Sequence, residues 1–438
     1  MDEAAAGLAA LLVVLVAYTA LARRLDRLSV TSALVFTVAG IALGTKGLDI
    51  LPLSLGAEST KLLAESTLAV LLFADAATVD ARAALNDAGL IVRLLFIGLP
   101  LGVVAGALAA AGVLPDLSWA ACLLLAAVLV PTDAALGLAV FGNRAIPTRV
   151  RRVLNVESGL NDGLATPIVF FLIAVVADEA TSGSPAALSH PIRAAVVDLT
   201  LGIGLGAAVG GLGGLLLVWA RARNATTGES EEIGVLALAA LSYVAALALG
   251  ANGFVAAFAG GLAFGALTRE AMRNRTGVTD TVGQVLAILV WVVFGSLLAG
   301  PVLLDGPDWR PIAYAVLSLA LVRMVSVAIA LLGTGLRRES VAFMGWFGPR
   351  GIASVVFVLV VVIELESAAP AIVETIATTG TWTILLSVIL HGVTAGPLGR
   401  MFGRRVEGFP ASAPERAGGP EPRIRRRHLA MPPAPSEP

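Results

Sequence analysis

Two polar interruptions of otherwise apolar segments decide the fold: residues 129–137 read LVPTDAALG, and residues 346–354 read WFGPRGIAS. A proline inside a helix removes a backbone donor and clashes with the preceding turn, so Pro131 and Pro349 are expected to break their helices. Each break lies beside a charged residue, Asp133 in the first and Arg350 in the second. Two prolines that merely kink packed helices are the alternative. The adjacent charges favour a site built from freed backbone groups.

The composition of the chain indicates a membrane protein. Of its 438 residues 57% are hydrophobic and 14% are charged, whereas about 25% of the residues in soluble domains are charged. So much apolar surface argues against a soluble globular enzyme. The net charge of −1 and the scattered basic residues provide no footprint for a nucleic-acid partner. The single cysteine, Cys122, excludes an intramolecular disulfide framework and a cysteine metal cluster.

A spanning helix needs about 20 mostly apolar residues, and this length divides the sequence into about thirteen segments. The predicted fold is an all-α polytopic membrane protein with spans at 4–22, 29–44, 59–79, 89–112, 118–142, 150–177, 192–220, 232–250, 253–268, 280–302, 311–334, 340–364 and 371–399. Because Asp2 and Glu3 precede it, the first span is interpreted as a membrane helix, with a cleaved leader as the alternative. Residues 1–403 are predicted to form the transmembrane domain. Residues 404–438, rich in Pro, Arg, Glu and Ala, are predicted to form a disordered cytoplasmic tail.

The distribution of lysine and arginine predicts the orientation. With the N-terminus outside and the C-terminus in the cytoplasm, nearly all basic residues fall on the inner side, as the positive-inside rule requires. Only Lys46, Lys61, Arg193 and Arg310 fall outside, and only Arg323 and Arg350, which lie inside apolar segments, are assigned to neither side. We therefore expect a multi-pass protein of the plasma membrane.

Six charged residues inside the predicted spans are candidates for a functional site. An ionisable side chain near the bilayer centre costs about 2.5–3.5 kcal/mol on insertion scales, so those that are retained need a reason. Four are acids and two are bases: Asp75, Asp133, Glu157, Asp162, Arg323 and Arg350. At least two carboxylates therefore lack a protein counter-charge. Such groups must be protonated or must hold a cation, and a group that can do either couples protons to cations.

Residues 155–167, NVESGLNDGLATP, place four polar side chains on one side of the sixth span. Glu157 and Asn161 are one turn apart, as are Ser158 and Asp162 on the neighbouring face. Asp162 and Asp133 are at depths at which they can meet near the middle of the membrane. Carboxylate, hydroxyl, amide and carbonyl oxygens suit a hard monovalent ion better than a soft metal.

The roles of the remaining buried polar residues are less specific. Arg323 and Glu157 lie at similar depths, so a structural ion pair is expected, with an ion ligand as the alternative. Arg350 is expected to neutralise half-helix carbonyls or to approach Asp133 or Asp75. Asp75 is the weakest candidate ligand, and His391 is expected to bridge helices by hydrogen bonds. The glycine-rich residues 202–214 are interpreted as a helix-packing face rather than a dinucleotide loop.

The motifs PTDAAL, VESGLND and FGPRGIAS, in this order, resemble those of sodium/proton exchangers of the cation:proton antiporter superfamily, especially the NhaP-type branch. The resemblance covers residues 4–403. It implies a homodimer, a protomer with inverted repeats and two crossing discontinuous helices, and elevator-like alternating access. The chain departs from the common third-helix pattern Phe-Glu-Gly-Gly, which here reads Phe73, Ala74, Asp75, Ala76. The shift of the acid by one position puts the role of Asp75 in doubt.

Carried over by position, the resemblance implies a cation- and proton-binding carboxylate at Asp162 with Asn161 as its partner. Ser158 and the Thr132 carbonyl resemble further Na⁺ ligands, Asp133 resembles a supporting acid, and Glu157 with Arg323 resembles the structural pair. An asparagine–aspartate pair implies electroneutral one-for-one exchange.

The predicted function is antiport of a monovalent cation, Na⁺ or alternatively K⁺ or Li⁺, for H⁺, with no cofactor and no catalytic residues. A cation channel that uses the same acids is the alternative. An intramembrane hydrolase lacks a His-paired nucleophile or a metal cluster in the apolar spans.

Overall fold

The computed structural model describes residues 3–28, 30–51, 53, 58–79, 86–133, 136–137, 140, 142–182, 189–268, 271–272, 274–304, 306, 308–410 and 412–416. These residues are helical throughout, apart from turns and short extended segments, and none of them lies in a strand. The elements are α1 (Glu3–Arg27), α2 (Ser32–Leu43), α3 (Glu58–Thr78), α5 (Ala88–Arg93), η1 (Leu94–Gly98), α6 (Leu99–Val113), α7 (Trp119–Leu129), α9 (Thr148–Ser182), α10 (Ser189–Ala222), α11 (Gly228–Ala248), α12 (Gly253–Thr268), α13 (Gly277–Phe294), η2 (Gly295–Ala299), α14 (Gly300–Leu304), α15 (Trp309–Val316), η3 (Leu317–Val322), α16 (Arg323–Ala330), α17 (Arg338–Trp346), α18 (Ile352–Leu365), α19 (Pro370–Glu407) and η4 (Pro414–Arg416).

The prediction of an all-helical, multi-pass membrane protein is confirmed. Helix coincides with each of the predicted spans, and three spans continue through a π-helical turn as the rods Ala88–Val113, Gly277–Leu304 and Trp309–Ala330. Among the described residues, eight helices are long and apolar enough to cross a membrane, and four apolar helices are shorter. The count of about thirteen crossings stays a prediction.

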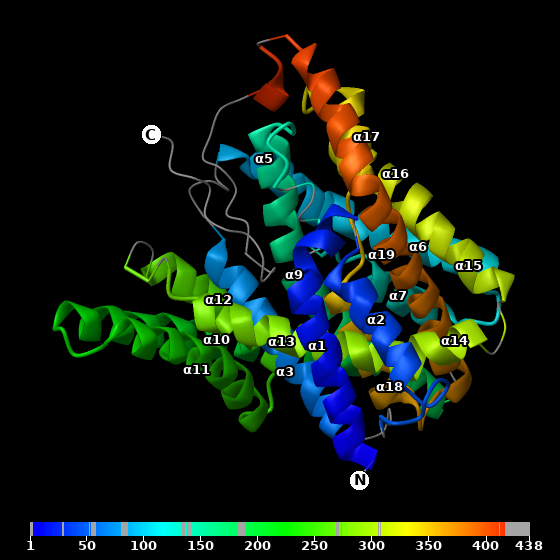
Figure 1. Cartoon of the computed structure of the whole chain (residues 1–438), viewed down its shortest axis with the longest axis horizontal. Helices are drawn as coiled ribbons and strands as arrows, with labels where there is room; N and C mark the ends of the chain where they lie inside the picture. The colour runs from blue at the N-terminus through cyan, green and yellow to red at the C-terminus, as the bar shows by residue number, and fades with distance from the viewer. Residues whose placement is uncertain are drawn as a thin grey trace.

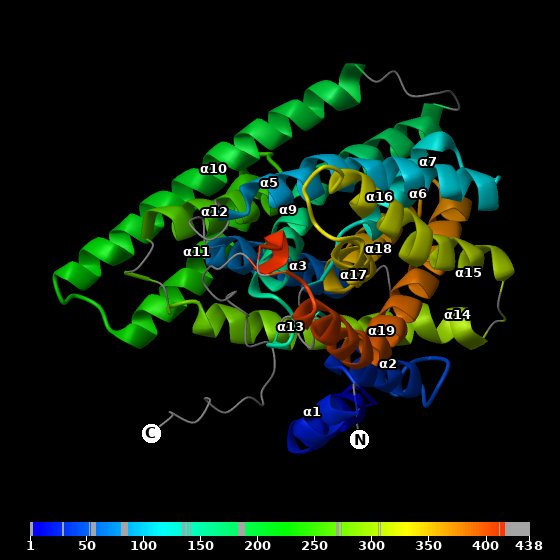
Figure 2. The same ribbon diagram turned by 90° about the horizontal axis from the view of Figure 1, so that it is seen from above.

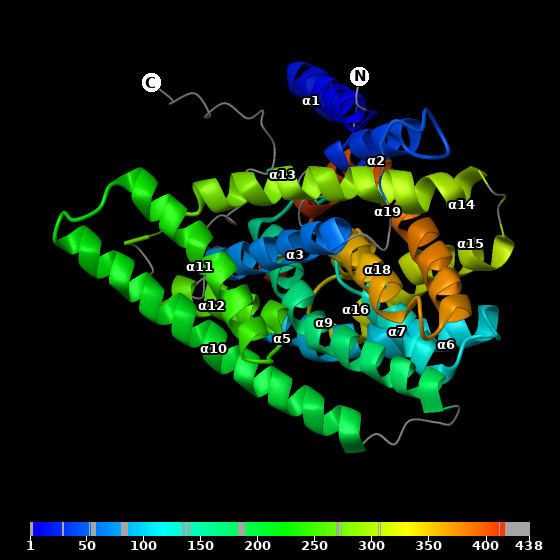
Figure 3. The ribbon, with the colours of Figure 1, turned by 90° about the horizontal axis from the view of Figure 1, so that it is seen from below.

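Helices α3 and α9, which carry Asp75 and the predicted site residues between 157 and 162, lie in the interior of the molecule. Helices α10, α11 and α12 form one end, and α6, α15 and α16 lie towards the opposite end (Figure 1). Helices α1 and α2 project from one side (Figure 2). Figure 3 shows α3, α9 and α18 between α10 on one flank and α13 on the other.

The glycine-rich stretch in α10 is a packing face, as predicted. A Cβ atom at Gly210 would overlap the backbone of Gly260 in α12, and one at Gly206 would overlap the carbonyl group of Ala256. Small residues allow the two backbones to touch, which is how membrane helices gain van der Waals contact. The α10–α12 contact forms one flank of the interior that holds α3 and α9.

Both predicted helix breaks are present. Helix α7 ends at Leu129, and residues 131–133 continue without helical structure. Helix α17 ends at Trp346, residues 347–351 are non-helical, and α18 begins at Ile352. The rest of the span predicted at 118–142 lies largely outside the described residues.

The start of the predicted tail is folded, so the boundary at residue 403 is too early. Helix α19 continues to Glu407, and the residues after it return to the helical body. Glu415 is 1% exposed, and its Oε1 accepts hydrogen bonds from the Arg337 backbone N–H (2.7 Å) and from Ser340 Oγ (2.8 Å). Glu415 thus caps the first turn of α17, a buried contact that hydropathy does not reveal. Residues 417–438 lie outside the described residues.

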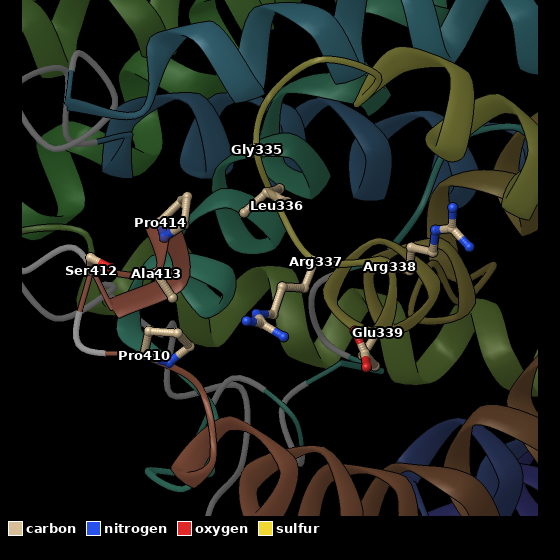
Figure 4. A pocket seen from close by; sticks show the side chains of 9 residues that line it. All are labelled: Gly335, Leu336, Arg337, Arg338, Glu339, Pro410, Ser412, Ala413 and Pro414. Atoms are coloured by element: carbon tan, nitrogen blue, oxygen red, sulfur yellow. The ribbon is translucent and has the colours of Figure 1, made fainter.

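A cavity of about 540 Å³ separates this C-terminal segment from the loop before α17. Figure 4 shows Pro410, Ser412, Ala413 and Pro414 on one side of it and Gly335 to Glu339 on the other. The Arg337 guanidinium lies 4.8 Å from the centroid of the Phe409 ring, and Arg149 Nη1 donates to the Pro414 carbonyl at 2.7 Å. The segment therefore joins the beginnings of α9 and α17.

Candidate functional site

The two helix breaks are hydrogen-bonded directly to each other. The Asp133 backbone N–H donates to the Pro349 carbonyl at 2.8 Å, and Asp133 Oδ2 accepts from the Ile352 N–H at 3.0 Å. In the opposite direction, Arg350 Nη1 donates to the Val130 carbonyl at 2.8 Å. Asp133 is 6% exposed and Arg350 1%, so the crossing excludes water from both charges.

Each of these charges lies at the helix end that stabilises it. The C-terminus of a helix carries a partial negative charge and its N-terminus a partial positive one. Arg350 binds a carbonyl at the end of α7, and Asp133 accepts a hydrogen bond from the first residue of α18. Of the alternatives left open for Arg350, the contact with half-helix carbonyls is the one that the structure shows.

The close approach of the two breaks explains Gly351. Its backbone passes so near Asp133 that a Cβ atom would overlap the Asp133 carboxylate and Cβ. Gly348 is similarly confined, because a Cβ there would lie 2.5 Å from Arg323 Nε and 3.0 Å from Thr132 Cγ2. The motif FGPRG therefore provides both the break and the space for the chain that crosses it.

Two residues of α9 attach that helix to the first break. Ser158 Oγ donates to the Thr132 carbonyl at 2.6 Å, and Asn161 Nδ2 donates to Thr132 Oγ1 at 2.7 Å. Ser158, Asn161 and Thr132 are all buried. Within the part of the chain that the structure describes, the buried Asn161 Oδ1 has no hydrogen-bond partner. Because a buried acceptor without a partner is costly, this oxygen is available to a ligand.

Asp162 follows Asn161 on α9 and is partly exposed. The next residue, Gly163, packs so closely on α12 that a Cβ would overlap the Phe258 ring. Asp162 therefore lies where α9 meets both the broken helices and the α10–α12 flank. Hydrogen bonds join Ser158 and Asn161 to Thr132, and Asp162 follows directly on α9; the role of these residues as ligands stays a prediction.

The ion pair predicted between Glu157 and Arg323 is present and is bidentate. Arg323 Nη1 donates to Glu157 Oε1 at 2.9 Å, and Nη2 donates to Oε2 at 3.1 Å. The side chains are 10% and 3% exposed, respectively. Two parallel bonds of this kind fix both groups in one geometry. The pair links α9 to α16 directly beside the crossing.

Two further residues singled out in the sequence, Asp75 and His391, lie on α3 and α19. Asp75 is partly exposed near the end of α3, and its role as a ligand stays a prediction. His391, in α19, lies 2.9 Å from the Trp346 carbonyl through Nε2. It therefore bridges α19 and the end of α17, as predicted.

Three residues with buried polar contacts were missed from the sequence: two serines at the crossing and one acid beside the beginning of α9. Ser387 Oγ accepts from the Arg350 backbone N–H at 2.7 Å and lies 3.2 Å from His391 Nδ1. Ser354 Oγ donates to the Val128 carbonyl in the last turn of α7 at 3.0 Å. Asp87 binds Arg149 (2.7 Å) and Arg152 (2.5 Å). Small hydroxyl residues in apolar helices were the only sequence signal for the two serines.

Arg152, one of the basic residues from which the orientation is predicted, also has a structural contact. It is 2% exposed and pairs with the equally buried Asp87, joining the beginning of α9 to the turn before α5. A buried arginine next to a predicted membrane boundary has the same sequence signature as an exposed one. The pair could not be recognised without the spatial position of Asp87.

The chain is similar to known proteins both in fold and in sequence. In fold, the chain is similar to the sodium proton antiporter MjNhaP1 from Methanocaldococcus jannaschii, with a TM-score of 0.75 at 20% identity over 92% of this chain and 99% of that one. In sequence it is 29% identical over 244 residues, 55% of its length, to the K⁺/H⁺ antiporter NhaP2 of Shewanella sp. strain ANA-3. This match spans only 41% of the NhaP2 chain. A Na⁺/H⁺ antiporter of Schizosaccharomyces pombe is 23% identical over 64% of both chains.

The family model for the transmembrane region of sodium/hydrogen exchangers matches residues 11–401. This range contains both helix breaks, the polar segment of α9 and Arg323. The chain therefore belongs to the sodium/hydrogen exchanger family.

Proposed function

We propose that this protein exchanges a monovalent cation for H⁺ across a membrane, with Asp162 binding the two ions in turn. The observation that carries the proposal is the position of Asp162 and Asn161 on α9, which is hydrogen-bonded to the break at Thr132. These residues, Ser158 and Thr132 carry oxygen atoms of the kind that hard cations prefer: the Asp162 carboxylate, Asn161 Oδ1, Ser158 Oγ and the Thr132 carbonyl.

The charges at the site support the uptake of a single positive charge. Asp133 and Arg350 each lie at a helix end that opposes their charge, and Glu157 is paired with Arg323. Three carboxylates against two guanidinium groups leave a formal excess of one negative charge, which we assign to Asp162. Either a proton or a monovalent cation neutralises it, whereas a divalent cation would leave a buried positive charge.

Competition for one carboxylate is sufficient to couple the two flows. We assume that the site turns from one side of the membrane to the other only when Asp162 is neutralised. Each cation that leaves must then be replaced by a proton, and each proton that leaves must be replaced by a cation. Net charge then does not move, so the exchange is electroneutral, as the asparagine–aspartate pair implies. The two broken helices supply the alternating access that such a cycle needs.

We propose Na⁺ or K⁺ as the transported cation, because relatives of this chain are named for both. Selectivity between alkali ions depends on the ligand field and the size of the cavity more than on ligand type. The protein is further proposed to be a homodimer in the plasma membrane, with its N-terminus outside and its C-terminus in the cytoplasm. No cofactor enters the cycle.

The decisive experiment replaces Asp162 by Asn in everted membrane vesicles that carry a proton gradient reported by a pH-sensitive dye. The wild type is expected to dissipate the gradient when Na⁺ or K⁺ is added, and Asp162→Asn is expected to lose this response. Asp178→Asn is the matched control, because Asp178 is a partly exposed acid on the same helix, four turns from the site. An Asp162→Asn variant that still dissipates the gradient would overturn the proposal.

A further inference from the structure

An intramembrane groove lies between α9 and α10. It has a volume of about 390 Å³, within the range of small-molecule sites. Its walls are almost entirely apolar and include Ile168 and Phe171 of α9 and Val196 and Leu199 of α10. In the predicted orientation the groove opens towards the outer leaflet, because α9 runs outwards and α10 runs inwards.

One carboxylate stands out among these apolar walls. Asp198 lines the groove and is partly buried. It lies six residues into the span predicted at 192–220, or about 9 Å along the helix from the outer end of that span. Among the described residues, none of the hydrogen bonds or ion pairs involves the Asp198 side chain. An ionised carboxylate inside a membrane helix is energetically unfavourable, so a partner of opposite charge is expected.

We propose that this groove binds a phospholipid of the outer leaflet whose headgroup carries a primary ammonium, with the ammonium on Asp198 and one acyl chain along α9. Asp198 lies in the outer quarter of the span predicted at 192–220, on the side of the outer-leaflet headgroups. Its negative charge attracts an ammonium and repels a headgroup that carries only a phosphate. An ammonium also donates hydrogen bonds, which a carboxylate accepts strongly.

The apolar surroundings of the groove support a lipid as its occupant. Val196, Val197 and Leu201 of α10 are 44–54% exposed, so the lip of the groove continues into a broad apolar surface. In a membrane such a surface faces lipid chains, which can enter the groove sideways without leaving the bilayer. The groove is thus accessible to lipid from the plane of the membrane.

The position of the groove connects this lipid to transport, a step that rests on the proposed function. Helix α9 carries Asp162, and Pro167 at the groove is five residues further along the same helix. Helices α9 and α10 are in contact (Figure 3). An acyl chain between them would resist their relative movement, so bound lipid is expected to change the rate of exchange.

Binding is tested on the full-length protein in detergent by native mass spectrometry after addition of phosphatidylethanolamine or phosphatidylglycerol. The wild type is expected to retain phosphatidylethanolamine with about two- to fivefold higher affinity, the range for an ion pair of this exposure. Asp198→Asn is expected to lose this preference. Glu374→Gln, which removes an exposed acid at the start of α19, is expected to keep it.

A second variant tests the apolar part of the groove. Ala174→Trp places a large side chain where Ala174 lines the groove, and it is expected to reduce retention of both lipids. Equal retention of the two lipids by the wild type, a preference that survives Asp198→Asn, or unchanged retention in Ala174→Trp would each overturn the proposal. These readouts do not depend on transport, so loss of the lipid site and loss of the proposed exchange are distinguishable.

Discussion

Removal of either member of the Glu157–Arg323 pair is expected to destabilise the protein strongly. Two substitutions remove one charge each: Arg323→Gln, which also shortens the side chain, and Glu157→Gln, which keeps its length. The partner that remains is buried, since Glu157 is 3% and Arg323 10% exposed in the pair. It loses its charged partner and at least one of the two bonds of the bidentate contact, which measure 2.9 and 3.1 Å.

The expected loss of stability depends on the burial of the two side chains rather than on the distance between their charges. Breaking a buried pair by removing one partner costs about 3–5 kcal/mol, because the other charge is left uncompensated. At about 2 °C per kcal/mol for a large chain, this predicts a fall in melting temperature of about 6–10 °C. The double variant leaves no unpaired charge, so it is expected to lose less than the sum of the two single variants.

The assay is thermal unfolding of the purified protein in detergent, followed by intrinsic fluorescence. Lys61→Gln is the internal control, because Lys61 pairs with Glu364 at 2.6 Å but both side chains are about 40% exposed. An exposed pair contributes less than about 1 kcal/mol, so this variant is expected to melt within about 2 °C of the wild type. An Arg323→Gln protein as stable as Lys61→Gln, or additive single and double variants, would refute the reasoning.

Two further predictions concern the crossing and the C-terminal segment. Gly351→Ala is expected to displace Asp133, on which the new Cβ would impinge, and to abolish cation-dependent dissipation of a proton gradient in vesicles; Gly112→Ala, in open space on α6, is expected to leave this activity unchanged. Truncation after Glu407 removes the Glu415 cap of α17 and is expected to destabilise the protein by about 1.5–3 kcal/mol in thermal unfolding, whereas truncation after Arg416 is not. Equal transport activity of Gly351→Ala and Gly112→Ala would contradict the close approach of Gly351 to Asp133. Equal stability of the two truncated proteins would contradict the contribution of Glu415.

The helices and their breaks were predictable because they depend on local signals. Apolar segments of membrane length mark the spans, and a proline beside a charge marks each break. The Glu157–Arg323 pair was also accessible, since helix rise places both residues at similar depths. Each of these inferences needs only the position of a residue along its own helix.

The contacts of the crossing were less predictable, because they depend on how the helices rotate about their axes. Depth alone allowed Arg350 to reach Asp133, Asp75 or the carbonyl groups of α7, and only the structure shows the contact with Val130. The cap that Glu415 provides to α17 joins residues 75 or more positions apart. A polar, proline-rich composition predicted disorder there because it contains no information on a single buried carboxylate.

The central claim is that H⁺ and the transported cation share Asp162, and proton release on cation binding tests it most directly. Purified protein in weakly buffered detergent solution would be titrated with Na⁺ or K⁺ while a pH dye records the protons released. Because the ions compete for one carboxylate, we expect the release of up to about one proton per cation bound, and none from Asp162→Asn. Cation binding without proton release by the wild type at a pH at which the site is protonated, or undiminished release by Asp162→Asn, would show that the two ions do not share Asp162.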